Sequence, residues 1–238
     1  MDVTAIIVNY NTLGLLQTAA NSFTKYYPNI ELIIVDNHST IDELGTHMYM
    51  DACKDNPSRP CKTRLIYNNT NIGHGPAMHQ AIQMVTTKYF YTLDTDTETF
   101  QTGHLEQMIR LLGAADNHYA SGWLRWVNSG GISADWYVPR PNDIEHTFIP
   151  YIHPFAALYK TELYHKLTPF IHHGAPCIQN MIDAMNKGYK VFEFGISHYV
   201  RHLIGGTRRM YTGIPQGDWA PTDDNKPAPW NPKAKVPI

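Results

Sequence analysis

The acidic pair Asp94 and Asp96 carries the strongest chemical signal in the sequence. The two carboxylates lie two residues apart in Asp94-Thr95-Asp96, directly after the apolar run YFYTL. Carboxylate oxygens are ligands that Mg²⁺ and Mn²⁺ favour, and a cation held by such a pair can bridge a diphosphate. The alternative for a DxD sequence is a polar turn or a helix cap. The position after a buried strand favours a site for Mn²⁺ or Mg²⁺.

Two further segments suit a nucleotide. Asp36 follows the apolar run IELIIV, where a carboxylate can accept hydrogen bonds from a ribose or a base. An Asx turn that only closes the strand is the alternative. Gly73 and Gly75 stand in a loop that opens a helix, where backbone N–H groups can approach a phosphate or a sugar. Met78 occupies the third glycine position of GxGxxG, which disfavours a dinucleotide-dependent dehydrogenase.

A late segment combines histidines with arginines. Residues 198–209 read HYVRHLIGGTRR. A histidine, three arginines and a flexible Gly-Gly pair suit a metal ligand next to a mobile clamp for a diphosphate. A solvated basic loop is the alternative.

The elements that must position these groups follow from the apolar pattern. Buried strands are predicted at Thr4–Val8, Ile30–Val35, Lys62–Tyr67 and Tyr89–Leu93, and helices at Leu13–Phe23, Asp42–Ala52 and Pro76–Val85. Strands without polar alternation, separated by helices, are typical of a parallel sheet covered on both faces. The polar residues after the strands should therefore converge on one crevice at the carboxyl ends.

The second half of the chain has a different character. An irregular aromatic segment is predicted from Trp123 to Tyr151, followed by a strand at Phe155–Lys160, a helix at Gln179–Asn186 and a strand at Lys190–Phe194. Residues 214–238 are rich in proline and polar residues, which predicts an extended tail.

Composition narrows the class of protein. The 238 residues are 43% hydrophobic and 17% charged, with a net charge of −2 and 13 histidines, which titrate near neutrality and bind metals. This composition argues against disorder and against a general basic surface for nucleic acid. Cys53, Cys61 and Cys177 lack CxxC spacing, so neither a disulfide framework nor a zinc knuckle is expected. Without a signal peptide or an apolar run of about 20 residues, we expect a cytoplasmic chain with no transmembrane segment.

Five segments, taken in chain order, resemble the family 2 glycosyltransferases, which have the GT-A fold. They are AIIVNYNT, LIIVDNHST, NNTNIGHGPAMHQAI, YFYTLDTDTE and NKGYKVFEFGISHYVRHLIGGT, and together they cover residues 3–207. The resemblance implies an α/β fold: a Rossmann-like, mostly parallel sheet with helices on both faces and a smaller irregular region on the acceptor side. It implies one domain over 1–213, with a nucleotide-sugar half at 1–100 and an acceptor half at 101–213.

The resemblance also implies a nucleotide-sugar donor, most often UDP-linked. The donor-binding candidates are Asn9, Asn11, Asp36, Gly73, Gly75, Asp94, His153, Arg208 and Arg209. Asp94, Asp96 and His202 are the candidates for the metal ligands. Four aromatic residues of the acceptor half can stack on a sugar ring or a nucleobase, or instead close the core: Trp123, Trp126, Trp136 and Tyr137.

One departure from the family concerns the catalytic base. Inverting members carry a Glu-Asp pair before the Gly-Tyr-Lys of residues 188–190, and Pro176-Cys177 stands in its place. The base candidates are then Asp183, His172 and His173, since imidazole takes a hydroxyl proton well near pH 7. Front-face attack with retention needs no protein base, and loss of catalysis is the third alternative.

The leading prediction is a metal-dependent glycosyltransferase that acts on a hydroxyl of a glycan, a lipid-linked or a protein acceptor. A modified base in DNA is the second acceptor class. Its local support is a set of basic residues: Arg201, Arg208, Arg209, Lys226, Lys233 and Lys235. A non-catalytic module that binds a nucleotide sugar or a glycan is the third hypothesis.

Overall fold

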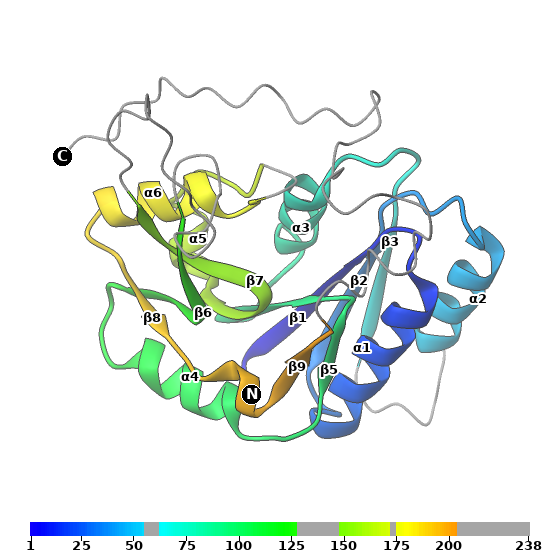
Figure 1. The fold of residues 1–238 in the computed structure, drawn as a ribbon, viewed down its shortest axis with the longest axis horizontal. Helices are drawn as coiled ribbons and strands as arrows, with labels where there is room; N and C mark the ends of the chain where they lie inside the picture. The colour runs from blue at the N-terminus through cyan, green and yellow to red at the C-terminus, as the bar shows by residue number, and fades with distance from the viewer. Residues whose placement is uncertain (55–61, 128–147, 172–174, 204–238) are drawn as a thin grey trace, which may run out of the picture.

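A seven-stranded mixed sheet forms the centre of the molecule (Figure 1). The computed structural model describes residues 1–54, 62–127, 148–171 and 175–203. The strands, in spatial order, are β3 (Thr63–Tyr67), β2 (Glu31–Asp36), β1 (Val3–Asn9), β4 (Tyr89–Asp94), β7 (Ile149–Lys160), β6 (His118–Val127) and β8 (Lys190–Glu193). The first four run parallel, β7 is antiparallel to both its neighbours, and β8 is parallel to β6.

Helices cover both faces of the sheet. On one face lie α1 (Leu13–Tyr26), α2 (Glu43–Lys54) and α4 (His104–Gly113), and on the other α3 (His74–Ile82), α5 (Thr161–Tyr164) and α6 (Ile178–Asn186). Successive residues of the strands enter opposite cores, as Ile6 and Ile7 of β1 do. A strand buried on both faces needs apolar residues at every position, which explains the continuous runs in the sequence.

A short second sheet brings a late segment to the end of β4. In it β5 (Thr97–Thr99) pairs with β9 (Val200–His202), and Thr97 lies opposite His202. A single turn of 3₁₀ helix, η2 (Ile196–His198), precedes β9. The pairing places His202 beside the turn that contains Asp94 and Asp96.

The structure confirms the predicted fold class and most of the expected elements. Expected and observed ends differ by three residues or fewer in the first half, where α3 begins at His74 rather than Pro76. The prediction of an irregular segment from Trp123 to Tyr151 is wrong where the structure describes it. Trp123 and Trp126 lie on β6, and Tyr151 lies on β7. Tryptophan and tyrosine favour strands, and Pro150, one of the prolines that suggested irregularity, lies in β7 opposite Trp126.

The described ranges contain no helix with the length and apolar character needed to cross a bilayer. Cys53 and Cys177 are buried.

His104, the first residue of α4, gives the fold a dependence on pH. Its side chain is buried, and its Nδ1 lies 3.1 Å from the hydroxyl of Tyr27. Burial lowers the pKa of His104 to about 3, whereas the unfolded chain takes up the proton near pH 6.5. The unfolded state therefore binds more protons between these values, and native stability falls as the pH is lowered below 6.5.

We expect His104→Gln to remove this part of the acid sensitivity. The wild-type free energy of unfolding should lose up to about 1.4 kcal/mol per pH unit below 6.5 from this one group. Urea unfolding at pH 7, 6, 5 and 4.5 measures the difference between wild type and variant. The same pH slope in both proteins would contradict this role of the histidine.

Candidate functional site

Asp94, Asp96 and His202 form a group with the geometry of a metal site. Asp94 ends β4, Asp96 lies in the following turn and His202 ends β9. One ligand atom from each residue lies within 4.8 Å of the others. His202 Nε2 is 3.4 Å from Oδ1 of Asp96. Two carboxylates and one imidazole are a donor set that suits Mn²⁺, so the residues present fit the predicted cation.

The electrostatics of the group favour a bound cation. Burial, followed by the charge of Asp96, raises the pKa of Asp94 to about 7. Burial works to lower the pKa of His202, but its hydrogen bond to Asp96 and the two carboxylate charges outweigh burial and raise it. Two carboxylates in one partly buried site repel each other, and a divalent cation offsets that repulsion.

His74 is a member of the site that sequence reasoning missed. Its Nε2 lies 3.5 Å from Oδ1 of Asp94, and burial lowers its pKa to about 4. The loop that presents it is held by Asn37, whose Nδ2 donates to Asn71 (2.7 Å) and whose Oδ1 accepts from the backbone of Ile72 (3.2 Å). Gly73 precedes it with a φ of +92°, a conformation suited to glycine. The only sequence signal was a histidine within a loop noted for its glycines.

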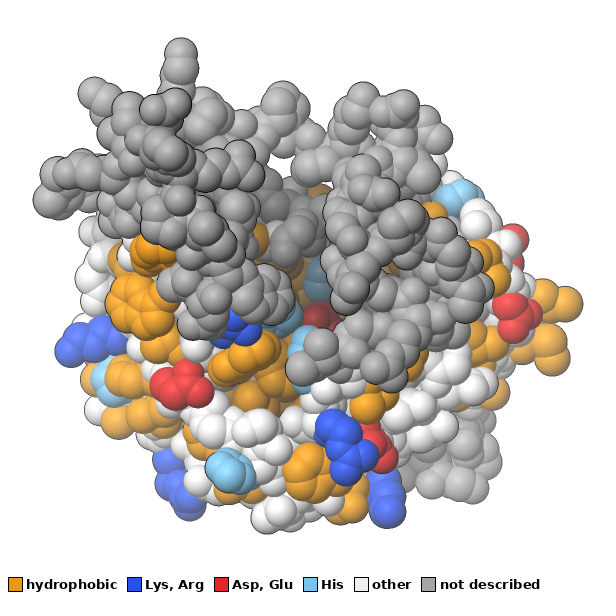
Figure 2. All heavy atoms as spheres, viewed as in Figure 1, with side chains coloured by type: hydrophobic (Ala, Val, Ile, Leu, Met, Phe, Trp, Pro, Cys, Tyr) orange, Lys and Arg blue, Asp and Glu red, His pale blue; other side chains and the backbone are white. Residues whose placement is uncertain are grey.

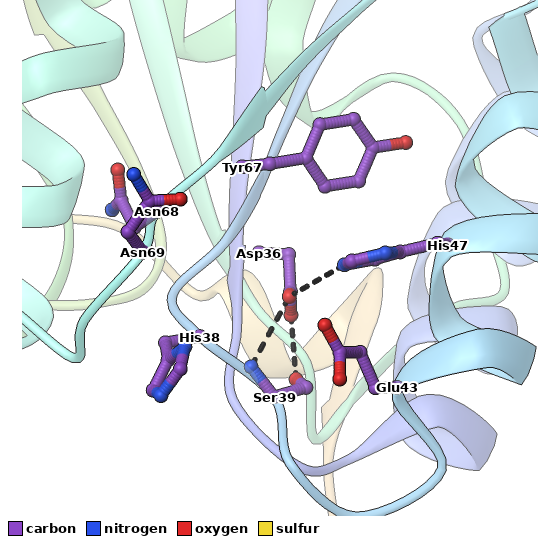
Figure 3. Close-up of a pocket in the computed structure, with 8 residues that line it drawn as sticks. All are labelled: Asp36, His38, Ser39, Glu43, His47, Tyr67, Asn68 and Asn69. Carbon is purple, nitrogen blue, oxygen red and sulfur yellow. Dashed lines mark hydrogen bonds and ion pairs between the residues drawn. The ribbon is translucent and has the colours of Figure 1, made fainter.

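A polar pocket of about 180 Å³ lies beyond the end of β2 (Figure 3). The residues that line it are Asp36, His38, Ser39, Glu43, His47, Tyr67, Asn68 and Asn69. Asp36 is buried at its base, where its carboxylate accepts from the backbone and the hydroxyl of Ser39 and pairs with His47 at 3.3 Å. Amides, carboxylates and an aromatic ring around one small hollow are groups that recognise a nucleoside.

Asn9 and Asn11 hold in place the loop after β2, which contributes to this pocket. Asn9 Nδ2 donates to Asp36 (3.1 Å) and to Ser39 (3.0 Å). Asn11 has a φ of +56°, and its Oδ1 accepts from the backbone N–H groups of Thr40 and Ile41. Both side chains thus hold the loop after β2 in place and do not line the pocket.

His153 and Trp123 pack against the metal group. The ring of His153 lies 5.7 Å from that of Trp123 and 5.9 Å from that of His202. Burial, and then the neighbouring His202 and His74, lower the pKa of His153 to about 3, so its ring is neutral. Trp123 lies 6.5 Å from His202.

Gly75 is buried in the first turn of α3, directly after His74. Two other predicted site residues have different surroundings. The side chain of Trp126 is exposed on β6. Asp183 lies on α6, where its Oδ2 accepts from the backbone of Thr168 (2.8 Å) and pairs with Lys187 (3.2 Å). The structure therefore does not bring Asp183 to the metal group.

The position of the missing acidic pair is apolar. Cys177 precedes α6 and is buried, and its thiol lies 3.8 Å from the hydroxyl of Tyr159. Burial raises the pKa of Cys177 far above neutrality, so the thiol cannot serve as a base near pH 7. The remaining predicted residues lie outside the described ranges: Trp136, Tyr137, His172, His173, Arg208 and Arg209.

Comparisons with known proteins agree with this geometry. The family model described as glycosyl transferase family 2 matches residues 4–178. A search against curated protein sequences found no match.

Among solved structures, the mannosyltransferase PcManGT from Pyrobaculum calidifontis, in complex with GDP-Man and Mn²⁺, is 17% identical, with a TM-score of 0.58 over 81% of this chain and 54% of its own. GalNAc-T7 with UDP, GalNAc and Mn²⁺ is 12% identical, with a TM-score of 0.62 over 80% and 42%. TarS of S. aureus with UDP (residues 1–349) is 14% identical, with a TM-score of 0.54 over 84% and 60%. The chain thus spans about half the length of these structures, and the likeness establishes the GT-A fold.

Proposed function

Because the chain belongs to glycosyltransferase family 2, we propose that it is a metal-dependent enzyme that moves a sugar from a nucleoside diphosphate to an acceptor hydroxyl. The observation that carries the proposal is the grouping of Asp94, Asp96 and His202 at the carboxyl end of β4. Solved GT-A structures bound to GDP-Man or UDP together with Mn²⁺ support it.

The spacing of the two polar sites suits a nucleoside diphosphate. Asp36 pairs in register with Asn9, and Asp94 with the preceding residue, Val8, so a single strand separates the two acidic residues. Strands lie about 4.8 Å apart, which puts the ends of β2 and β4 roughly 10 Å from each other. In the proposal the nucleoside, most often uridine in this family, occupies the pocket at Asp36, and the diphosphate extends to Asp94 and Asp96. Residues 1–100 are then the nucleotide-sugar half and residues 101–213 the acceptor half, with His202, Arg208 and Arg209 of the second half reaching the diphosphate.

The chemistry follows from where charge develops. The acceptor oxygen bonds to C1 of the sugar, the bond from C1 to the diphosphate breaks, and the acceptor proton leaves. A divalent cation, when bound, would neutralise negative charge on the leaving diphosphate. Asp94, Asp96 and His202 would hold that cation, and Arg208 and Arg209 would add positive charge to the same group.

Three side chains are candidates for the base that removes the proton of the acceptor hydroxyl. Asp183 already accepts from Thr168 and Lys187, which favours His172 or His173 as the base. Front-face attack, in which the leaving diphosphate takes the proton, stays as the alternative with retention. The identity of the anomer formed from a donor of known configuration separates these cases.

The DNA acceptor has weaker support than a glycan, lipid-linked or protein acceptor. Arg201, the member of the basic set within the described ranges, pairs with Glu98 at 2.8 Å. That pairing reduces the charge available for phosphates, which duplex binding requires.

Thermal unfolding with a panel of UDP- and GDP-sugars, each with and without Mn²⁺, tests the proposal. A donor at a hundredfold excess over its Kd stabilises the folded state by about 2.7 kcal/mol. We expect one nucleotide class to stabilise the protein only when Mn²⁺ is present, and turnover with an acceptor separates an enzyme from a non-catalytic module. No stabilisation by any donor would overturn the proposal.

His74 should act as a positioning residue for Asp94. We expect His74→Ala to raise the apparent Kd for Mn²⁺ about tenfold, since Asp94 loses the contact that orients its carboxylate. His74→Gln keeps a side-chain N–H and should restore part of the affinity. His79→Gln, on the same helix but bonded to Tyr164, is the control. Equal Mn²⁺ affinity in all four proteins would contradict this role.

A further inference from the structure

A second and larger pocket is lined in part by His202. It encloses about 530 Å³ between the β6–β7–β8 part of the main sheet and the small β5–β9 sheet. This volume falls within the range of ~300–1,000 Å³ that is typical of small-molecule sites. Apart from His202, none of the residues that line it has a role in the proposed donor site.

The wall of this pocket is aromatic and continuous with the metal group. The ring of Phe155 stacks on that of His202, with centroids 4.7 Å apart and planes at 23°. Trp123 meets Phe155 edge to face at 5.6 Å, and Phe194 completes the lining beyond them. Figure 2 shows hydrophobic side chains on this face reaching the central hollow where histidine and acidic side chains are visible. A ligand in the pocket would therefore lie directly beside the proposed reaction centre.

The polar side chains that line the pocket are those of Glu193, Ser197, Arg201 and His202. Oε2 of Glu193 accepts from the backbone N–H of Leu124 at 2.6 Å, which leaves Oε1 without a partner in the described part of the chain. Arg201 lines the same pocket, but it is paired with Glu98. Glu193 thus offers a carboxylate oxygen to a ligand in a pocket that is also lined by aromatic rings.

We propose that this pocket binds a sugar ring of the acceptor, so that the acceptor is a glycan or a glycoside. A pyranose ring has a face of C–H bonds that packs against aromatic rings, and it has hydroxyl groups at its edge that donate to a carboxylate. A nucleic acid would bring its phosphates near Glu193 and the acidic metal group, and Arg201, the arginine that lines the pocket in the described ranges, is already paired with Glu98. The inference rests on the proposed function, because only a glycosyltransferase has an acceptor.

Binding of neutral methyl glycosides tests the inference. The probes are the methyl glycosides of glucose, galactose, mannose and N-acetylglucosamine, observed by saturation-transfer NMR in the presence of UDP and Mn²⁺. We expect at least one to bind the wild type, and Phe194→Ala and Glu193→Gln each to weaken its binding at least tenfold. Both variants should keep the wild-type thermal shift with UDP and Mn²⁺.

Two variants outside the pocket serve as controls for the same measurement. Met48→Ala and Glu162→Gln change exposed side chains outside the pocket and should bind the glycoside as the wild type does. The inference is overturned if no glycoside binds a protein that does bind UDP and Mn²⁺, if both pocket variants bind normally, or if single-stranded DNA displaces the glycoside. Absence of any UDP or GDP binding would instead overturn the proposed function.

Discussion

Asp96→Ala is expected to lower the rate of sugar transfer about a thousandfold or more. Asp96 supplies one of the three ligand atoms of the metal group, and it faces His202 at 3.4 Å. A metal ion that stabilises a developing charge contributes several kcal/mol to the transition state, and each 1.36 kcal/mol is a factor of ten in rate. The measurement is the steady-state rate with the donor that the thermal screen identifies, at saturating Mn²⁺.

Glu98→Gln is the matched control for this loss. Glu98 lies two residues further along the chain, and its partner is Arg201 rather than a member of the metal group. The control should retain most of the wild-type rate. An Asp96→Ala enzyme that turns over at the wild-type rate would show that transfer does not use this acidic pair.

Asp36→Ala is expected to lower the free energy of unfolding by about 3 kcal/mol. Asp36 is 1% exposed, and its carboxylate accepts hydrogen bonds from Asn9 and Ser39 as well as pairing with His47. Its removal leaves buried donors without a partner, which costs more than the bonds themselves contribute. Urea unfolding at pH 7 measures the loss.

Two milder variants show whether the buried network causes this effect. Asp36→Asn keeps one acceptor oxygen and should lose less stability than Asp36→Ala. His47→Gln changes a partner that is about one-third exposed, so its effect should be small. Equal stability of Asp36→Ala and wild type would contradict the network. Donor affinity in Asp36→Asn then reports on the nucleoside pocket separately from folding.

The first half of the fold could be predicted because its signals are local. Strands such as β1 and β2 are buried on both faces, so their apolar runs stand out from the amphipathic helices between them. The rule that ligands bind at the carboxyl ends of parallel strands then placed Asp36 and Asp94 on one edge. Their roles as ligands stay predictions, although the structure places both residues at that edge.

The second half could not be predicted as well because its signals are long-range. The strands β5 and β9 have three residues each, and they exist through pairing between segments about a hundred positions apart. The ten-residue strand β6 carries a register shift between Ser121 and Trp123, which interrupts the regular pattern of a strand.

The candidate site also combines residues that local sequence signals identify with residues that only long-range contacts bring together. Family resemblance placed His202 with the acidic pair, and the β5–β9 pairing brings it there. His74 and Glu193 lie in the two neighbouring parts of the site through loop geometry and strand register, which no single segment of sequence encodes.

Direct titration with Mn²⁺ tests the central claim, that Asp94, Asp96 and His202 hold a divalent cation for the donor. Free Mn²⁺ is measured by electron paramagnetic resonance in the presence of UDP, for the wild type and Asp96→Asn. The account predicts one bound Mn²⁺ per chain in the wild type and at least a hundredfold weaker binding in the variant. Equal Mn²⁺ binding in the two proteins, or none in a wild type that binds UDP, would contradict it.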